Sequence, residues 1–246
     1  MSEALHDVRA DEPTLLQLTR DLAEDPDRRD PLEVDGALES MVLHPDYPCL
    51  GARSVFNRDR ATVVALGEMA SEEATRGLHD ALRDFGRDTD QSAGFASLVA
   101  VFPDTVVDDE GQFESLLWRQ LEKLHEADRQ PWNPQVSDDP GNPHFAFSVA
   151  GTAYFVVGLH PAASRIARRT PLPTLVFNLH QQFEDLRASD RFERMRDTIR
   201  RRDTALQGDV NPMVADHGAG SEARQYSGRA VPTDWAAPVN FDEETP

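Results

Sequence analysis

The sequence predicts an α+β fold: an antiparallel or mixed sheet of about four to six strands with helices packed on it, in a single domain. Short runs rich in β-branched and aromatic residues predict the strands, and longer segments with apolar residues at helical spacing predict the helices. A short gap at Gly151-Thr152 between two strand-like runs predicts an antiparallel hairpin. The strand-like runs are residues 61–66, 95–102, 144–149, 153–159 and 175–177.

The chain divides into a long body and two acidic ends. Residues 1–35 are charged and rich in Asp, Arg and Pro, which predicts an acidic N-terminal appendage. Residues 36–241 form the predicted domain, because no Pro/Gly-rich linker divides them. Residues 242–246 form an acidic tail.

Three helical regions follow from capping and periodicity. Ser71 is a predicted N-cap that opens a helix to about Phe85. Acidic residues 108–110 begin a second helix, in which apolar side chains recur at helical spacing to about Asp128. In the third region the apolar face changes direction along the chain, so a break or bend is predicted near residues 188–190.

The charge composition narrows the classes of partner. The formal net charge is −19 and Lys123 is the single lysine. Excess acid repels nucleic acid and anionic membranes, so neither is expected as a partner. No apolar run approaches the ~20 residues that span a bilayer, and a cytoplasmic protein is expected. The composition indicates a halophilic protein; an acidic protein from a GC-rich genome is the alternative.

Polar residues and glycines gather in the segment from Asn211 to Arg229, which has little helical or strand periodicity. This pattern predicts an ordered loop that builds the wall of a site, with a solvated connection as the alternative. The sequence contains no GxGxxG after a strand, no Walker loop, no HExxH and no GxSxG. That absence disfavours a nucleotide-binding oxidoreductase, an NTPase, a zincin and an α/β-hydrolase.

Three side chains stand out as candidate metal ligands. His160 ends a strand-like run, and a hydrogen-bonded histidine that closes a turn is the alternative. His180 shares a helical face with Glu184 and Arg187, which is either a site wall or a solvated face. Cys49, the only cysteine, is a soft ligand or a small buried apolar residue.

Several long motifs occur in the order seen in a known family. They are Tyr-Pro-Cys-Leu-Gly-Ala-Arg (47–53), Leu-Leu-Trp-Arg-Gln-Leu (116–121), Phe-Val-Val-Gly-Leu-His-Pro-Ala-Ala-Ser-Arg (155–165), Leu-Val-Phe-Asn-Leu-His-Gln-Gln-Phe-Glu-Asp-Leu-Arg (175–187), Asn-Pro-Met (211–213) and Ser-Glu-Ala-Arg-Gln-Tyr-Ser-Gly-Arg (221–229). On these motifs the chain resembles the YqcI/YcgG family over residues 40–241.

The resemblance implies a function. Some members of this family are haem-dependent enzymes that N-hydroxylate a guanidino group of arginine or a related small molecule, so haem b and such a substrate are expected. Nothing in the sequence resembles a flavin or iron–sulfur module, so an external reductase, a ferredoxin or a peroxide must support the reaction. A homodimer is one alternative for the oligomeric state. The alternative functions are a haem-binding or haem-handling protein without oxygenase activity and a binding protein without metal.

Roles for individual residues follow from the resemblance together with residue chemistry. His160 is the first candidate for the axial ligand, because a strand end fixes its position; His180 is second and Cys49 third. The remaining candidates are Arg165, Arg168 and Arg224 for carboxylates of haem or substrate, Glu222, Glu184 and Asp216 for a guanidinium substrate, and Tyr226 and Ser221 as catalytic hydrogen-bond donors.

Overall fold

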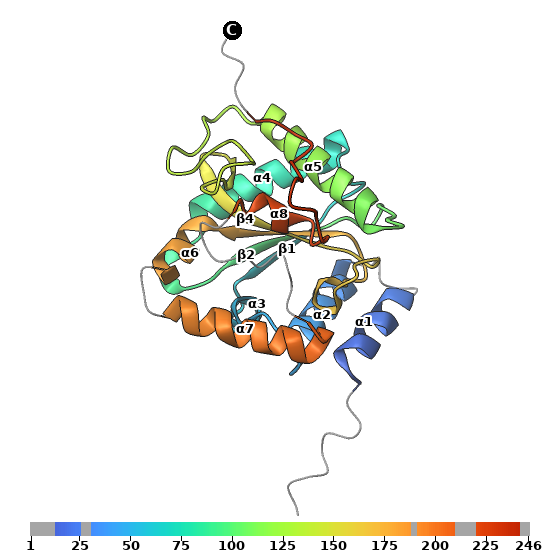
Figure 1. The fold of residues 1–246 in the computed structure, drawn as a ribbon. Coiled ribbons are helices and arrows are strands. Elements are labelled where there is room, and N and C mark those ends of the chain that lie inside the picture. Colours follow the sequence, from blue (N-terminus) through green and yellow to red (C-terminus); the bar gives the residue numbers. More distant parts are fainter. Residues whose placement is uncertain (1–12, 26–30, 188–190, 210–219, 242–246) are drawn as a thin grey trace, which may run out of the picture.

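A five-stranded mixed sheet lies at the centre of the computed structural model, with helices on both of its faces (Figure 1). The structure describes residues 13–25, 31–187, 191–209 and 220–241. The strands are β1 (Ala61–Ala65), β2 (Ser97–Val101), β3 (Phe147–Val149), β4 (Thr152–Leu159) and β5 (Thr174–Leu179). Their order in the sheet is β1-β2-β5-β4-β3, which confirms the predicted α+β class and strand number.

The pairing of the strands follows from their connections. β1 and β2 are parallel because a helical crossover joins them, and the remaining neighbours are antiparallel. β3 and β4 form the predicted hairpin, in which Val149 is paired with Thr152. Ala150 and Gly151 make the turn with φ angles of 51° and 72°, the backbone that suits a two-residue hairpin loop. The turn thus lies one residue before the predicted gap, since Thr152 already belongs to β4.

Helices α4 (Glu72–Asp88), α5 (Glu110–Ala127) and α8 (Ala223–Tyr226) cover one face of the sheet (Figure 1). Ser71 caps α4 as predicted, because its side chain accepts a hydrogen bond from the backbone N–H of Ala74. Asp109 caps α5 in the same way through Gln112. The apolar faces of α4 and α5 pack on the sheet in a core that contains Leu78, Leu82, Phe113, Leu117 and Trp118.

Helices α1 (Leu15–Glu24), α2 (Pro31–Leu43), α3 (Leu50–Asn57) and α7 (Arg191–Gln207) lie on the opposite face of the sheet (Figure 1). α6 (His180–Arg187) follows β5 directly, and short 3₁₀ turns occupy Gln91–Ala93 (η1) and Ile166–Arg168 (η2). The second core contains Leu38, Met41, Val42 and Leu172. The fold therefore has three layers, helices–sheet–helices.

Strand β2 shows why both faces need a cover. Leu98 and Ala100 belong to the core under α4 and α5, whereas Val99 and Val101 belong to the core under α1 and α2. Successive side chains of a strand point to opposite faces, so an uninterrupted apolar run requires two apolar layers. This pattern fits the buried strand that was predicted for residues 95–102.

The ends of the chain extend the predicted organisation. Within residues 1–35, predicted as an appendage, Leu15 is fully buried in the second core, because α1 turns an apolar face towards the body. α6 ends at Arg187 and α7 begins at Arg191; the predicted break at residues 188–190 lies outside the described residues, as does the tail 242–246. Among the described helices, none combines the length and apolar character needed to cross a membrane.

Candidate functional site

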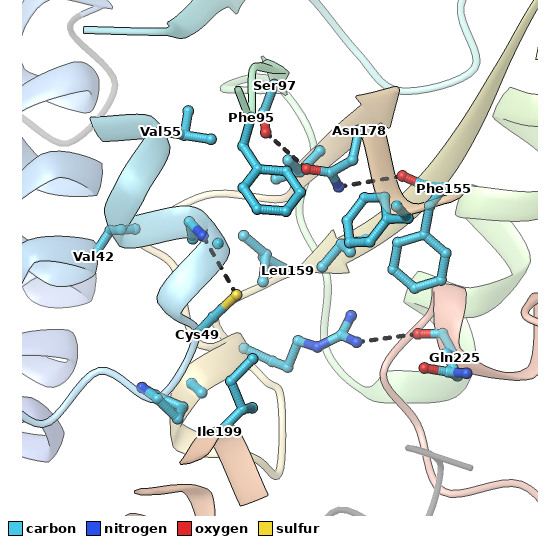
Figure 2. A pocket seen from close by; sticks show the side chains of 18 of the residues that line it. Val42, Cys49, Val55, Phe95, Ser97, Phe155, Leu159, Asn178, Ile199 and Gln225 are labelled. Atoms are coloured by element: carbon cyan, nitrogen blue, oxygen red, sulfur yellow. Dashed lines mark hydrogen bonds between the residues drawn. The ribbon is translucent and has the colours of Figure 1, made fainter. Parts of the chain in front are cut away.

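A cavity of about 340 Å³ lies between the sheet and the helices α2, α3, α6 and α7 (Figure 2). Its volume is in the range of ordinary small-molecule sites, roughly 300–1,000 Å³. Aliphatic and aromatic side chains make up most of the wall, and a few polar groups interrupt it. Such a composition is typical of a site that binds an apolar body and orients it with a few polar contacts.

The sheet supplies one wall of the cavity through matching side chains on three adjacent strands. Residues of β2, β5 and β4 that are paired in register lie side by side on this face. The two rows are Ser97–Asn178–Phe155 and Val99–Val176–Val157. Ser97 Oγ donates to Asn178 Oδ1 at 2.7 Å, and Asn178 Nδ2 donates to the carbonyl oxygen of Phe155 at 3.2 Å (Figure 2). The first row therefore places a fixed polar group within an otherwise apolar wall.

Three phenylalanines line the cavity next to this polar group. Phe183 of α6 lies between Phe95 and Phe155, with ring centroids 5.6 Å and 5.8 Å away respectively. These spacings are in the range at which aromatic rings attract one another. The three rings are tilted relative to one another, and they give the cavity an aromatic lining that comes from separate parts of the chain.

Cys49 brings a sulfur atom into the cavity, as Figure 2 shows. It is the N-cap of α3, and its Sγ accepts a hydrogen bond from the backbone N–H of Ala52 at 3.4 Å. Burial raises the pKa of the Cys49 thiol, while the amides of Ala52 and Gly51 and the charge of Arg168 lower it. The surroundings thus hold a neutral thiol together with the groups that would stabilise a thiolate.

Arg168 places a cation in the same wall. Its Nη1 donates to the carbonyl oxygen of Gly158 at 2.9 Å. Its Nη2 donates to the carbonyl oxygen of Gln225 at 3.2 Å, the bond drawn beside Gln225 in Figure 2. Burial lowers the pKa of Arg168, and its charge in turn lowers the pKa of Cys49 and opposes the effect of burial on Tyr47. Two carbonyl groups hold this guanidinium in place, and its positive charge favours the thiolate form of Cys49.

An acidic group lines another part of the cavity. Glu222 Oε1 accepts a hydrogen bond from Arg187 Nη2 at 3.0 Å, and Arg187 also pairs with Glu184 through Nη1. Burial raises the pKa of Glu222, the charge of Arg187 lowers it and that of Glu184 raises it. Glu222 and Arg187 both line the cavity, whereas Glu184 is not part of its wall and is partly exposed.

His160 lies on the other face of the sheet. Its ring stacks on Phe113 of α5 with centroids 4.3 Å apart, and its Nδ1 is buried without a hydrogen-bond partner among the described residues. Leu159, one residue earlier, does line the cavity. The alternation that assigns Leu159 to the cavity therefore assigns His160 to the core beneath α5.

The other predicted site residues divide between the cavity and the protein framework. His180 does not line the cavity; its Nε2 lies 3.6 Å from Glu184 Oε1. Asp216 lies outside the described residues. Four others make structural contacts. Arg165 is paired with Asp203 and Asp209, and Arg224 donates to the carbonyl oxygens of Pro232, Thr233 and Trp235. The Tyr226 hydroxyl accepts from Phe147 N–H and donates to the Tyr154 carbonyl, and the Ser221 hydroxyl accepts from Ala223 N–H.

The structure thus brings together Cys49, Arg168 and Glu222 from the predicted set and adds residues that the sequence did not single out. The added residues are Tyr47, Phe95, Ser97, Phe155, Asn178 and Phe183. Arg187, which the sequence placed on one helical face with His180 and Glu184, also lines the cavity. Tyr47 belongs to the same motif as Cys49, so its position in that motif is the signal that could have identified it. The strand residues could be found only with the pairing register, because their neighbours on the wall are distant in the sequence.

The fold and the cavity define a class of protein: a three-layer α+β protein with a largely apolar cavity between one sheet face and its helices. The chain belongs to the YqcI/YcgG family, whose family model matches residues 38–240. It is 30% identical over 162 residues to the uncharacterized protein YqcI of Bacillus subtilis. The aligned region covers 63% of this chain and 64% of YqcI.

A second similar protein comes from the same organism. The chain is 27% identical over 187 residues to the uncharacterized protein YcgG of Bacillus subtilis. The aligned region covers 73% of this chain and 74% of YcgG. The matched part therefore spans just under two thirds of the length of YqcI and about three quarters of that of YcgG. No solved structure matches the chain.

Proposed function

We propose that the protein is a haem-dependent oxygenase that holds haem b in the cavity and N-hydroxylates a guanidino group of arginine or a related small molecule. The observation that carries this proposal is the Cys49 sulfur, which faces an apolar, aromatic-lined cavity from the N-terminus of α3. Thiolate is one of the axial ligands that proteins use for haem iron, and it is the ligand associated with oxygen activation. The family resemblance supplies the reaction class.

The donor set of the cavity fits such a group. A ligated thiol gives up its proton, and the amides of Gly51 and Ala52 and the charge of Arg168 favour the resulting thiolate. Phe95, Phe155 and the valines of the sheet offer the apolar contacts that a porphyrin needs. Guanidinium groups in the wall suit the carboxylates of haem or substrate.

Cys49 is the preferred ligand over the two histidines on geometric grounds. Of these three candidates it alone lines the cavity, while His160 stacks on Phe113 beneath the opposite sheet face. His180 lies beside Glu184 and is also absent from the cavity wall. Cys49, the third candidate in the sequence analysis, is therefore the first choice in this proposal.

The residues of the chain would bind and orient the reactants. Arg168 orients a carboxylate, Glu222 accepts hydrogen bonds from a guanidinium, and the phenylalanines exclude water from the cavity. When bound, haem supplies the redox chemistry that activates the oxidant. The overall reaction with O₂ places one oxygen atom on the guanidino nitrogen and releases the other as water, using two electrons from an external reductase or ferredoxin and two protons. A peroxide replaces both O₂ and the electrons.

A hemin titration tests the cofactor and its ligand. The wild-type chain is expected to bind one equivalent of hemin and to show the Soret and ferrous–carbon monoxide bands of thiolate ligation. Cys49→Ser should lose these bands, because a hydroxyl is a poor ligand for haem iron. His160→Phe, the matched control on the other sheet face, should keep them. A wild-type chain that gives no stoichiometric Soret band would overturn the haem proposal.

A product assay tests the reaction separately. The hemin-loaded chain is supplied with arginine and either a reductase system or hydrogen peroxide, and mass spectrometry follows a product heavier by one oxygen atom. Hydroxylation of the guanidino nitrogen is expected. A thiolate-type spectrum without hydroxylation of arginine or any other guanidine would instead identify a haem-binding or haem-handling protein.

A further inference from the structure

We propose that the outer edge of β1 is a self-association surface, through which two copies of the chain pair their β1 strands antiparallel about a two-fold axis at Val63. β1 lies at one end of the sheet order, whereas the cavity is built on the central strands β2, β5 and β4. No residue of β1 lines the cavity. The surface is therefore separate from the proposed haem site and does not depend on it.

Within the chain, β1 uses only half of its backbone groups. The Arg60 carbonyl accepts from β2 at 3.2 Å and the Leu66 N–H donates to β2 at 2.8 Å, so the even-numbered residues of this segment face β2. Ala61, Val63 and Ala65 alternate with them and turn their N–H and C=O groups outward. No hydrogen bond from the described residues reaches these outward groups.

The edge lacks the features that usually protect a free strand. Its sequence, Ala-Thr-Val-Val-Ala, contains no charge, proline or glycine. None of its five residues is buried, whereas every residue of the neighbouring strand β2 is buried. The strand at the opposite end of the sheet, β3, is only three residues long. An exposed, uncharged edge of five residues is a template for a further strand, which would satisfy its free donors and acceptors.

The second copy fits because the edge is self-complementary. A two-fold axis at Val63 pairs this residue with its own copy and pairs Ala61 with Ala65 of the second chain. All of these residues face outward, so each pair is of the type that exchanges both backbone hydrogen bonds. Thr62 then lies opposite Val64 of the second chain, and cross-strand pairs of β-branched side chains stabilise a sheet. Any other two-fold register uses fewer of the outward groups.

The charges that flank the edge favour the same register. Arg58 precedes β1 and Glu68 follows it; both are exposed, and neither has an ion pair among the described residues. The first end also carries Asp59 and Arg60, which leaves it with one positive charge. The second end also carries Asp104 and the acidic first turn of α4, which makes it negative. The antiparallel register places the positive end of each copy beside the negative end of the other.

Sedimentation equilibrium of the full chain tests the surface. The measurement is made in about 0.15 M and about 1 M KCl, which limit the reach of the net charge of −19 to about 8 Å and about 3 Å. The wild-type chain is expected to form a dimer and no larger species, because a two-fold pairing is closed. A chain that stays monomeric at about 1 mM in both salts, or that grows beyond a dimer, would overturn the proposal.

A proline at the axis tests the hydrogen bonds. Val63→Pro removes an N–H that points outward, whereas the bonds to β2 belong to the neighbouring residues, so the fold should persist. The dissociation constant of the dimer should rise at least about tenfold, since both copies lose a bond. Val63→Thr is the matched control: it keeps the N–H and the β-branched shape and should change the constant less than about threefold. Equal constants for the two variants would contradict the register.

Charge exchange tests the ends of the edge and remains decisive if Val63→Pro misfolds. Arg58→Glu and Glu68→Arg should each raise the dissociation constant about threefold to tenfold, because each places like charges together at both ends of the dimer. The variant that carries both changes restores opposite charges and should regain nearly the wild-type constant. Within one chain the two positions lie on either side of β1, more than a screening length apart, so they cannot compensate there. A double variant as weak as the two losses combined would refute the pairing.

Discussion

Arg165, Arg168 and Arg224 have the same side chain but different surroundings. Arg165 is paired with two aspartates, and Arg224 lies 5.8 Å from the Trp235 ring while it donates to backbone carbonyls. Arg168 is the one of these three that lines the cavity. The sequence could nominate all three as carboxylate-binding groups, but only their partners in the fold separate a structural arginine from one that acts on a site.

His160 allows a prediction about pH at the scale of a residue. Burial lowers the pKa of His160 to about 4, from about 6.5 in an unfolded chain. Between these values the unfolded chain binds a proton that the folded chain excludes. The free energy of unfolding should therefore fall as pH drops from about 6.5 to about 4, with His160 contributing about 3 kcal/mol of the decrease.

Urea unfolding at a series of pH values measures this contribution. His160→Phe keeps a ring against Phe113 and removes the titrating group, so the decrease in its unfolding free energy should be smaller by about 3 kcal/mol over the same interval. Other titrating groups affect both proteins alike, and subtraction removes their contribution. Parallel curves for the two proteins would show that His160 is not buried in its neutral form.

At the scale of secondary structure, the elements could be predicted more reliably than their faces. Periodicity indicated the strand run at 153–159 and the helix that begins near residue 110, and both occur. Which face of β4 meets the cavity could not be predicted, because helices cover both faces and both carry apolar residues. Thus Leu159 and His160, adjacent in the sequence, belong to opposite layers.

Strand β4 approaches α5 so closely that the position of Gly158 has no room for a side chain. A Cβ atom there would lie 2.5 Å from Phe113 Cε1 and 2.9 Å from Leu117 Cδ1. Gly158→Ala should therefore destabilise the fold by about 1–3 kcal/mol through overpacking. Gly36→Ala in α2 is the matched control: it meets nothing within 4 Å and should stabilise by roughly 0.5–1 kcal/mol. Chemical denaturation measures both, and equal effects would contradict this close packing.

At the scale of the molecule, the cavity depends on an arrangement that no local pattern contains. Ser97 and Asn178 are adjacent because β5 is inserted between β2 and β4 in the sheet order. Cys49 comes to the same space from α3, a helix on the far side of the cavity (Figure 2). Residue chemistry could therefore suggest Cys49 and Glu222, whereas the aromatic and polar wall required the strand order and register.

The acidic composition leads to a prediction for the whole molecule. The chain carries 44 Asp and Glu against 25 Lys and Arg, and this excess of like charge opposes the compact state. Molar KCl shortens the screening length to about 3 Å and should relieve the repulsion. We expect the melting temperature to rise by roughly 4 °C or more between low salt and molar KCl, which corresponds to about 1–2 kcal/mol of unfolding free energy for a chain of this size.

A sucrose series separates screening from preferential exclusion, because sucrose stabilises folded proteins without screening charge. A melting temperature that stays constant or falls as KCl rises would contradict the halophilic interpretation and favour an ordinary acidic protein from a GC-rich genome.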